Sequence, residues 1–152
     1  MTQPVRLSRK KAAKYPGMRW EALNEFCTSH DVSELTPVQR IAYLAYWYAS
    51  DVQNAEHHQY FLHMADFDQV EVINALRAVE AMEQASVLDD AFRTIGIAAD
   101  GAPQNTNRYL TGVEMADFTE FDDAFAKCAK PVFACLMDYL DKHEGEFIEW
   151  TP

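Results

Sequence analysis

Residues 36–53 read TPVQRIAYLAYWYASDVQ, and this stretch decides the fold. Thr36 can cap a helix, Pro37 suits the first helical position, and Gln39 completes a capping box. Beyond this start, apolar side chains recur every three or four residues, namely at Val38, Ile41, Ala45, Tyr48 and Val52. Such a stripe is typical of a helix that faces a protein core. The sequence therefore predicts a long buried helix that ends at about residue 53.

Apolar patterns on both sides of this stretch predict further helices. They cover residues 18–29, residues 57–64, a segment that begins at Asp66, residues 85–97, and a longer pattern from 118 to 139. Pro131 interrupts the last pattern, which predicts a kink or two helices end to end because proline lacks a backbone N–H. Residues 99–112 are rich in turn-forming residues and are expected to form a loop.

These patterns predict an all-α fold, a single compact multi-helix domain of six to eight helices over residues 17–152. A basic arm, ordered at most in part, precedes it over residues 1–16. With 152 residues, 49% of them hydrophobic, the chain can bury one core. It has no apolar run long enough to span a membrane, and no apolar segment follows its basic start as in a secretory signal. Three cysteines without metal-site spacing favour reduced thiols in a cytoplasmic protein, and they are Cys27, Cys128 and Cys135.

Charge is divided unevenly along the chain. Residues 1–20 contain no acid and six bases, which are Arg6, Arg9, Lys10, Lys11, Lys14 and Arg19. The other seven of the 13 Lys/Arg stand against all 24 Asp/Glu, so residues 21–152 are 17 charges negative. Such a body repels nucleic acid and anionic membranes and attracts basic surfaces. For the basic arm three interpretations stay open: contact with the acidic body or with a second copy in a homodimer, disorder, or contact with nucleic acid.

Several acids lie at helix ends where they need an explanation. Glu80 and Glu83 close one predicted helix, and Asp138, Asp141 and Glu144 close the last one. The helix dipole disfavours carboxylates there, and like charges three residues apart repel one another. Two interpretations remain: a solvated acidic surface, or a docking face for a basic protein that these five residues contact. We expect the second to be tested by the salt dependence of binding.

Residues 51–61 read DVQNAEHHQYF. This stretch has an acidic residue, valine and Asn54 before a break, and Gln59, Tyr60 and Phe61 after it. It closely resembles the signature of the bacterial DNA-mimic protein family. The resemblance extends over about residues 34–148. This chain departs from the family pattern at the break, where the family usually has Asn-Gly-Gly and this sequence has Ala55-Glu56. The departure predicts a different turn, or a helix that runs on without a sharp break.

The resemblance implies an all-helical acidic protein. Some members of the family imitate the phosphate charge of duplex DNA and occupy the DNA-binding site of another protein. Carboxylates spaced along a helix face can present a row of charge comparable with that of phosphates. The motif residues are Asp51, Asn54, Gln59, Tyr60 and Phe61, and we interpret them as structural. We expect the rings of Tyr60 and Phe61 to lie in the core and Gln59 to secure the backbone at the break. An alternative is an immunity-type protein that blocks a partner by shape through residues 54–63.

No other chemistry is indicated. His57, His58 and His63 lie near two acids, but their spacing places them on different faces of a helix. We therefore expect surface histidines and no metal. The sequence contains no phosphate-binding loop, nucleophile elbow or Cys/His pair, so neither an enzyme nor a cofactor is expected.

Overall fold

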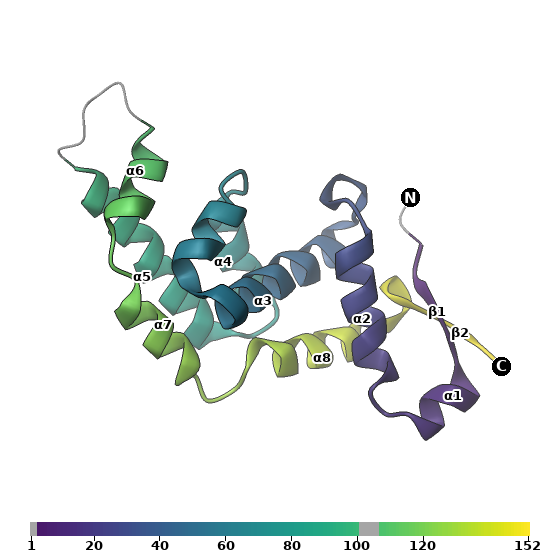
Figure 1. Ribbon diagram of the computed structural model, residues 1–152. Coiled ribbons are helices and arrows are strands. Elements are labelled where there is room, and N and C mark those ends of the chain that lie inside the picture. The colour runs from purple at the N-terminus through teal and green to yellow at the C-terminus, as the bar shows by residue number, and fades with distance from the viewer. Residues whose placement is uncertain (1–2, 101–106) are drawn as a thin grey trace.

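The structure is a computed structural model that describes residues 3–100 and 107–152 (Figure 1). Over these ranges it contains eight α-helices, two short 3₁₀ turns and two short strands. The helices are α1 (Arg9–Lys14), α2 (Met18–Ser29), α3 (Pro37–His63), α4 (Gln69–Ala78), α5 (Met82–Ala99), α6 (Arg108–Met115), α7 (Thr119–Ala126) and α8 (Val132–Lys142). The strands are β1 (Val5–Ser8) and β2 (Ile148–Thr151). The prediction of an all-α fold with six to eight helices is confirmed.

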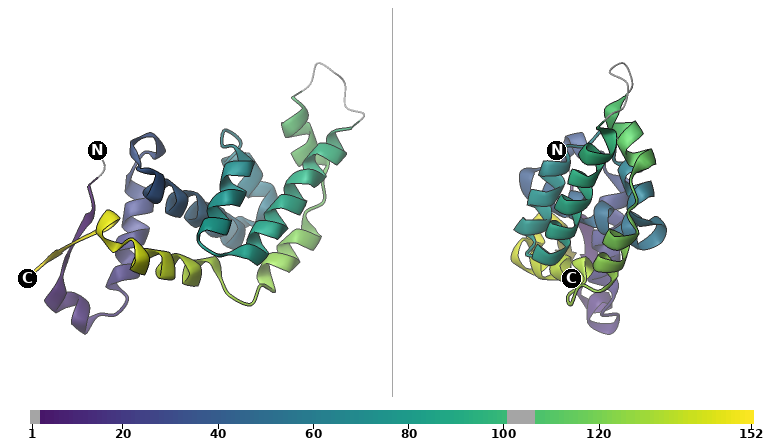
Figure 2. Two further views of the ribbon diagram at one scale, coloured as in Figure 1. Left: turned by 180° about the vertical axis from the view of Figure 1, so that it is seen from behind. Right: turned by 90° about the vertical axis from the view of Figure 1, so that its left-hand side faces the viewer.

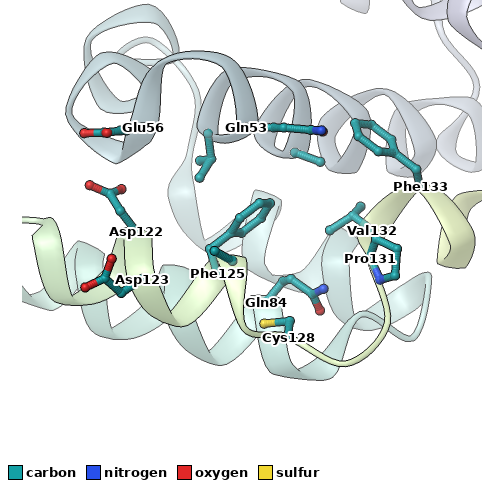
Figure 3. Close-up of a pocket in the computed structure, with 13 residues that line it drawn as sticks. Gln53, Glu56, Gln84, Asp122, Asp123, Phe125, Cys128, Pro131, Val132 and Phe133 are labelled. Carbon is teal, nitrogen blue, oxygen red and sulfur yellow. The ribbon is translucent and has the colours of Figure 1, made fainter.

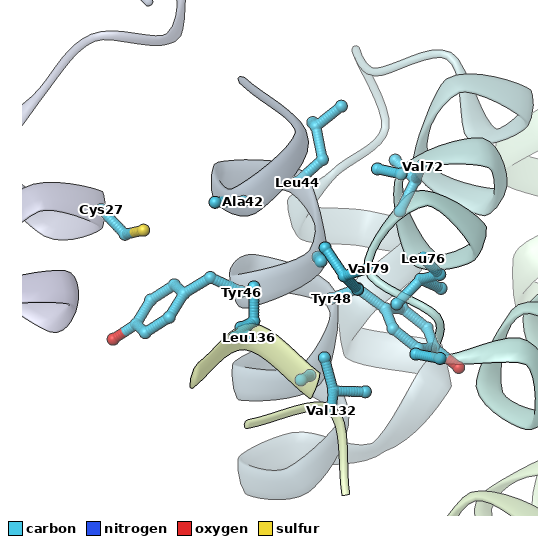
Figure 4. Close-up of a cluster of buried hydrophobic side chains, with 14 of the residues drawn as sticks. Cys27, Ala42, Leu44, Tyr46, Tyr48, Val72, Leu76, Val79, Val132 and Leu136 are labelled. Atoms are coloured by element: carbon cyan, nitrogen blue, oxygen red, sulfur yellow. The ribbon is translucent and has the colours of Figure 1, made fainter. Parts of the chain in front are cut away.

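Helix α3 is the centre of the molecule, and it begins as its sequence predicts. Gln39 donates its backbone N–H to Thr36 Oγ1 at 3.2 Å, and Thr36 donates its N–H to Gln39 Oε1 at 3.0 Å. Figures 1 and 2 show α3 with α8 running beside it, α2 crossing one end, and α4 and α5 packed near the other. Figure 4 shows the fully buried Tyr48 of α3 on the side of Leu76 of α4, and Tyr46 on the side of Cys27 of α2.

Helix α3 is broken close to where the sequence predicts a break. Two helical segments meet at a kink at Glu56, which has φ 68° and ψ 172°, and the second segment ends at His63. This region of backbone space is occupied almost only by glycine. Ala55-Glu56 therefore does not form a smooth helix, because Glu56 adopts a backbone conformation that a glycine would adopt more easily.

Two other boundaries are corrected. Helix α4 begins at Gln69, capped by Asp68, whose Oδ1 accepts the N–H of Val70 at 2.9 Å, and not at Asp66. The loop predicted over residues 99–112 overlaps the first part of α6, because Asn107 Oδ1 accepts the N–H of Leu110 at 3.1 Å and starts a helix there. Part of that loop, residues 101–106, lies outside the described residues. The interruption at Pro131 separates α7 from α8, as the sequence predicts.

The two ends of the chain pair with each other. Strand β1 lies parallel to β2, in the register Val5 to Ile148 (Figure 1). Arg6 forms a salt bridge with Glu149 at 3.3 Å, and the guanidinium of Arg9 lies 5.2 Å from the ring centre of Trp150. The basic arm thus contacts the acidic body of the same chain, which corresponds to the first interpretation left open for it. Within residues 3–100 and 107–152, no helix has the length and apolar content that crossing a membrane requires.

Candidate functional site

A buried hydrogen-bonded chain crosses the break in α3. The imidazole of His57 is fully buried, and its Nε2 lies 2.8 Å from the hydroxyl of Tyr48. Its Nδ1 and its backbone N–H lie 2.7 and 2.9 Å from the same oxygen, Oδ1 of Asp122 on α7. The break leaves the N–H of His57 without a helical partner, so Asp122 caps the second half of α3 from a different helix.

The direction of these bonds follows from the chemistry of the groups. A carboxylate only accepts, so Nδ1 of His57 donates to Asp122, and the Nε2 of a neutral imidazole then accepts from Tyr48. Burial lowers the pKa of His57, with the hydrogen bond to Asp122 opposing it, and burial raises the pKa of Tyr48 well above its ordinary value. Both shifts favour a neutral imidazole and a protonated phenol. His57 is therefore a buried structural histidine, and its predicted surface position is wrong.

A pocket of about 470 Å³ opens beside this chain. Helices α3, α5, α7 and α8 and the segment before α8 line it with Ala49, Val52, Gln53, Glu56, Gln84, Asp122, Asp123, Phe125, Ala126, Cys128, Pro131, Val132 and Phe133. Figure 3 shows the side chains of Glu56, Asp122 and Asp123 at one end of the pocket and Val132 and Phe133 at the other. Three carboxylates thus border a hollow whose wall is partly polar and partly apolar, an arrangement suited to a ligand with a cationic head and an apolar stem.

The motif residues take different positions in the structure. Tyr60 and Phe61 are fully buried, and Tyr60 donates its hydroxyl to Gln69 Oε1 at 2.7 Å. Asp51 lies 2.6 Å from Nδ1 of His63. Gln59, by contrast, is exposed, and its side chain makes no hydrogen bond to a described residue. Asp122 secures the backbone at the break in place of the role predicted for Gln59.

Asn54 is also at the surface. It is exposed, and its Nδ2 donates a long hydrogen bond of 3.5 Å to Ser50 Oγ within the same helix. His58, exposed as well, stacks near Phe118 with 6.4 Å between ring centres. In the described ranges, no three His, Cys, Asp or Glu side chains are grouped so that they could hold a metal ion.

The structure divides the five acids predicted to contact a partner. Glu80 and Asp138 line one narrow crevice with Lys142, so the ends of α4 and α8 meet on one surface. Lys142 lies 3.7 Å from Glu80, and Lys130 pairs with Asp138. These two acids are therefore brought together, but each has a base of the same chain beside it.

Asp141 and Glu144 form a second group, held by the base that follows the arm. Arg19, at the start of α2, pairs with both, and its Nη2 lies 3.0 Å from Glu144 Oε2. Glu83 is exposed in the first turn of α5 and forms no salt bridge with a described residue. Burial and, second, the negative charge of Glu83 raise the pKa of Cys128, a residue of the pocket wall, so Glu83 lies close to the pocket.

Exposed acids without such a neighbour are spread over the described residues, and three of them lie around α7. Glu56, Glu120 and Asp123 are exposed and form no salt bridge with a described residue. Two of them border the pocket. Sequence reasoning missed this group because Glu120 and Asp123 lie near a helix N-terminus, where the macrodipole alone accounts for them. The partner of His57, Asp122, borders the same pocket, and the general need of a buried histidine for a polar partner is what connects the two.

Comparison with known proteins agrees with the motif. A family model described as DMP19-like protein matches residues 33–143. No curated protein and no solved structure matches the chain. The matched region includes the whole of helices α3 to α8, and it therefore contains the buried chain and the whole pocket. The chain belongs to the DMP19-like protein family, the DNA-mimic family that residues 51–61 resemble.

Proposed function

We propose that this protein docks through its acidic surface on a basic protein, and that the partner is a DNA-binding protein whose DNA site the carboxylates occupy. A net charge of −11 and membership of the DMP19-like family support the proposal. The observation that carries it is the group of exposed, unpaired carboxylates around α7, formed by Glu56, Glu120 and Asp123. We propose no catalytic role for the hydrogen-bonded chain of Tyr48, His57 and Asp122, because the hydroxyl of Tyr48 is enclosed in the core, away from any substrate.

The charge distribution favours α7 as the centre of the docking face. Glu80, Asp138, Asp141 and Glu144 have a Lys or Arg of the same chain within salt-bridge distance, which reduces the field that a partner meets. Glu120 and Asp123 are three residues apart on α7, so their side chains lie on neighbouring positions of one face. A partner with Lys and Arg arranged for phosphates would meet uncompensated charge there.

The two acidic regions can be compared directly. We expect the double variant Glu120→Gln with Asp123→Asn to bind the partner more weakly than the double variant Asp138→Asn with Asp141→Asn. Both variants lose two negative charges, so they differ only in which acidic region is changed. Binding should also weaken steeply as salt increases, because charge contacts are screened. Salt-insensitive binding, or binding that neither double variant changes, would contradict the acidic docking proposal. Helical content measured by circular dichroism controls for folding.

A second candidate is an immunity-type function in which shape dominates. Its support is the run of exposed side chains at the strained break, at Gln53, Asn54, Ala55, Glu56, His58 and Gln59. Changing His58 and Gln59 to Ala leaves the net charge unchanged if His58 is neutral, and it leaves the buried His57 intact. A large loss of partner binding in this variant, with little effect of salt, would favour the shape-driven function over DNA mimicry.

A further inference from the structure

We propose that the pocket between α3, α5, α7 and α8 receives the guanidinium group of an arginine side chain on the partner protein. The inference rests on the proposed docking function, and it adds to it a defined anchor: a single partner residue seated in a cavity. The cavity of about 470 Å³ is within the size range of ligand pockets, which is about 300–1,000 Å³.

The acidic end of the pocket is built and not merely exposed. Both hydrogen bonds from His57 end on Oδ1 of Asp122, which fixes this carboxylate, while Oδ2 accepts no hydrogen bond from a described residue. The side chain of Asp122 is 19% exposed. Glu56 reaches the same end from the backbone position with φ 68°, a conformation that non-glycine residues occupy at a cost of about 1–3 kcal/mol. The fold thus fixes the carboxylate of Asp122 at the pocket and places Glu56 beside it.

A buried amide provides a further hydrogen-bond acceptor at the pocket, in addition to the carboxylates. Gln84 on α5 is only 3% exposed and lines the pocket. Its Nε2 donates to the backbone carbonyl of Lys130 at 2.6 Å, which fixes the amide, but its Oε1 accepts no hydrogen bond from a described residue. This oxygen is therefore available to accept a hydrogen bond from the N–H groups of a ligand in the pocket.

The rest of the wall suits an arginine better than a lysine. Phe125, Pro131 and Phe133 contribute flat or apolar surfaces, and none of the residues that line the pocket is Lys, Arg or His. A guanidinium is planar, stacks on rings, is weakly hydrated and donates up to five N–H groups in a fork that matches carboxylates. An ammonium is strongly hydrated and would lose more water on entering the pocket.

The test does not need the partner to be known. The full-length protein, labelled with ¹⁵N, is titrated with N-acetyl-argininamide, with N-acetyl-lysinamide, and with the uncharged isostere N-acetyl-citrullinamide. We expect saturable shifts of backbone amides in residues 52–57 and 122–133 with the arginine compound, weaker binding of the lysine compound, and none with citrulline. Absence of saturable shifts, or equal affinity for any two of the three compounds, would overturn the proposal.

Variants separate the pocket from general negative charge. Glu56→Gln with Asp123→Asn should weaken binding of the arginine compound about tenfold, the loss of one charge-assisted hydrogen bond. Asp90→Asn, an exposed acid of α5 outside the pocket, is the control and should leave the affinity unchanged. If the double variant and the Asp90→Asn control lost the same affinity for the arginine compound per charge removed, the proposal would be overturned. These variants leave Asp122 and its bonds to His57 intact, so folding is preserved.

The outcome is separable from that of the docking proposal. If a partner is captured and displaced by DNA while the arginine compound does not bind, the pocket proposal alone is wrong. If the arginine compound binds saturably but no partner that DNA displaces is found, the docking function is wrong and the guanidinium site remains.

Discussion

His57 and Asp122 are joined twice through one oxygen. The backbone N–H and the Nδ1 of His57 lie 2.9 and 2.7 Å from Oδ1 of Asp122, so the cap of a broken helix and the partner of a buried imidazole are the same atom. This contact ties the second half of α3 to α7. It also places a fixed carboxylate beside the pocket, which links the stability of the fold to the geometry of the candidate site.

Removing the last member of this buried chain should destabilise the protein. Tyr48→Phe leaves Nε2 of the buried His57 without a donor, and we expect the free energy of unfolding to fall by about 1–3 kcal/mol. Tyr43→Phe is the matched control, because the half-buried hydroxyl of Tyr43 makes no hydrogen bond to a described residue. Urea denaturation measures both. Similar losses for the two variants would show that the bond from Tyr48 to His57 contributes nothing.

The protein should lose stability in mild acid through His57. Burial lowers the pKa of His57 below its ordinary value of 6.5, so the unfolded chain binds a proton that the folded protein does not. The contribution is complete above about pH 6.5 and declines as the pH falls toward the folded pKa, by at most about 1.4 kcal/mol per pH unit.

A variant isolates this contribution from the other titrating groups. In His57→Asn the amide can still donate to Asp122 but does not titrate. The difference in unfolding free energy between the unchanged protein and the variant should therefore shrink as the pH is lowered from about 7.5 to about 5. A difference that stays constant or grows over this range would contradict a neutral, buried His57.

Restoring glycine at the break should stabilise the fold. Glu56→Gly removes the strain of φ 68° at a cost in chain entropy, and we expect a net gain of about 1 kcal/mol in unfolding free energy. Ala55→Gly, one residue earlier in regular helix, should instead lose about 0.5–1 kcal/mol. Thermal denaturation of the pair provides the comparison. If both substitutions destabilise the protein, the backbone of Glu56 is not strained.

A second pair of glycines tests the contact between α5 and α6. A Cβ at Gly112 would lie 2.3 Å from the backbone oxygen of Ile95, so Gly112→Ala must push the two helices apart and should cost about 1–3 kcal/mol. A Cβ at Gly96 meets nothing within 4 Å, so Gly96→Ala should stabilise α5 by about 0.4–1 kcal/mol. Chemical denaturation measures the change in unfolding free energy for each variant. Changes of the same sign would contradict the packing described for α6.

Local sequence signals predict the helix starts, limits and breaks that depend on residues close together in the chain. The capping box of Thr36 and Gln39, the limits of α2 at residues 18–29, and the division of the last helices at Pro131 all follow from interactions a few residues apart. Helix α6 was predicted as loop because its first turn follows many turn-forming residues. Its cap, Asn107, is itself a residue type shared by turns and helix starts.

The candidate site could not be predicted in the same way. His57 and Asp122 are 65 residues apart in sequence, and no local pattern indicates that they meet. The strained φ of Glu56 is likewise set by tertiary contacts, since the local sequence Ala55-Glu56 favours regular helix. The pairing of β1 with β2 joins residues from the two ends of the chain, beyond the reach of helical periodicity.

Under the proposed function, this acidic protein and duplex DNA compete for the same site on a basic DNA-binding protein. The most direct measurement is capture from a bacterial lysate on the immobilised full chain at low salt, followed by elution with duplex DNA and identification of the eluted protein. The account predicts that a DNA-binding protein is retained and that duplex DNA releases it. Retention of partners that duplex DNA does not release, or of no basic protein at all, would contradict it.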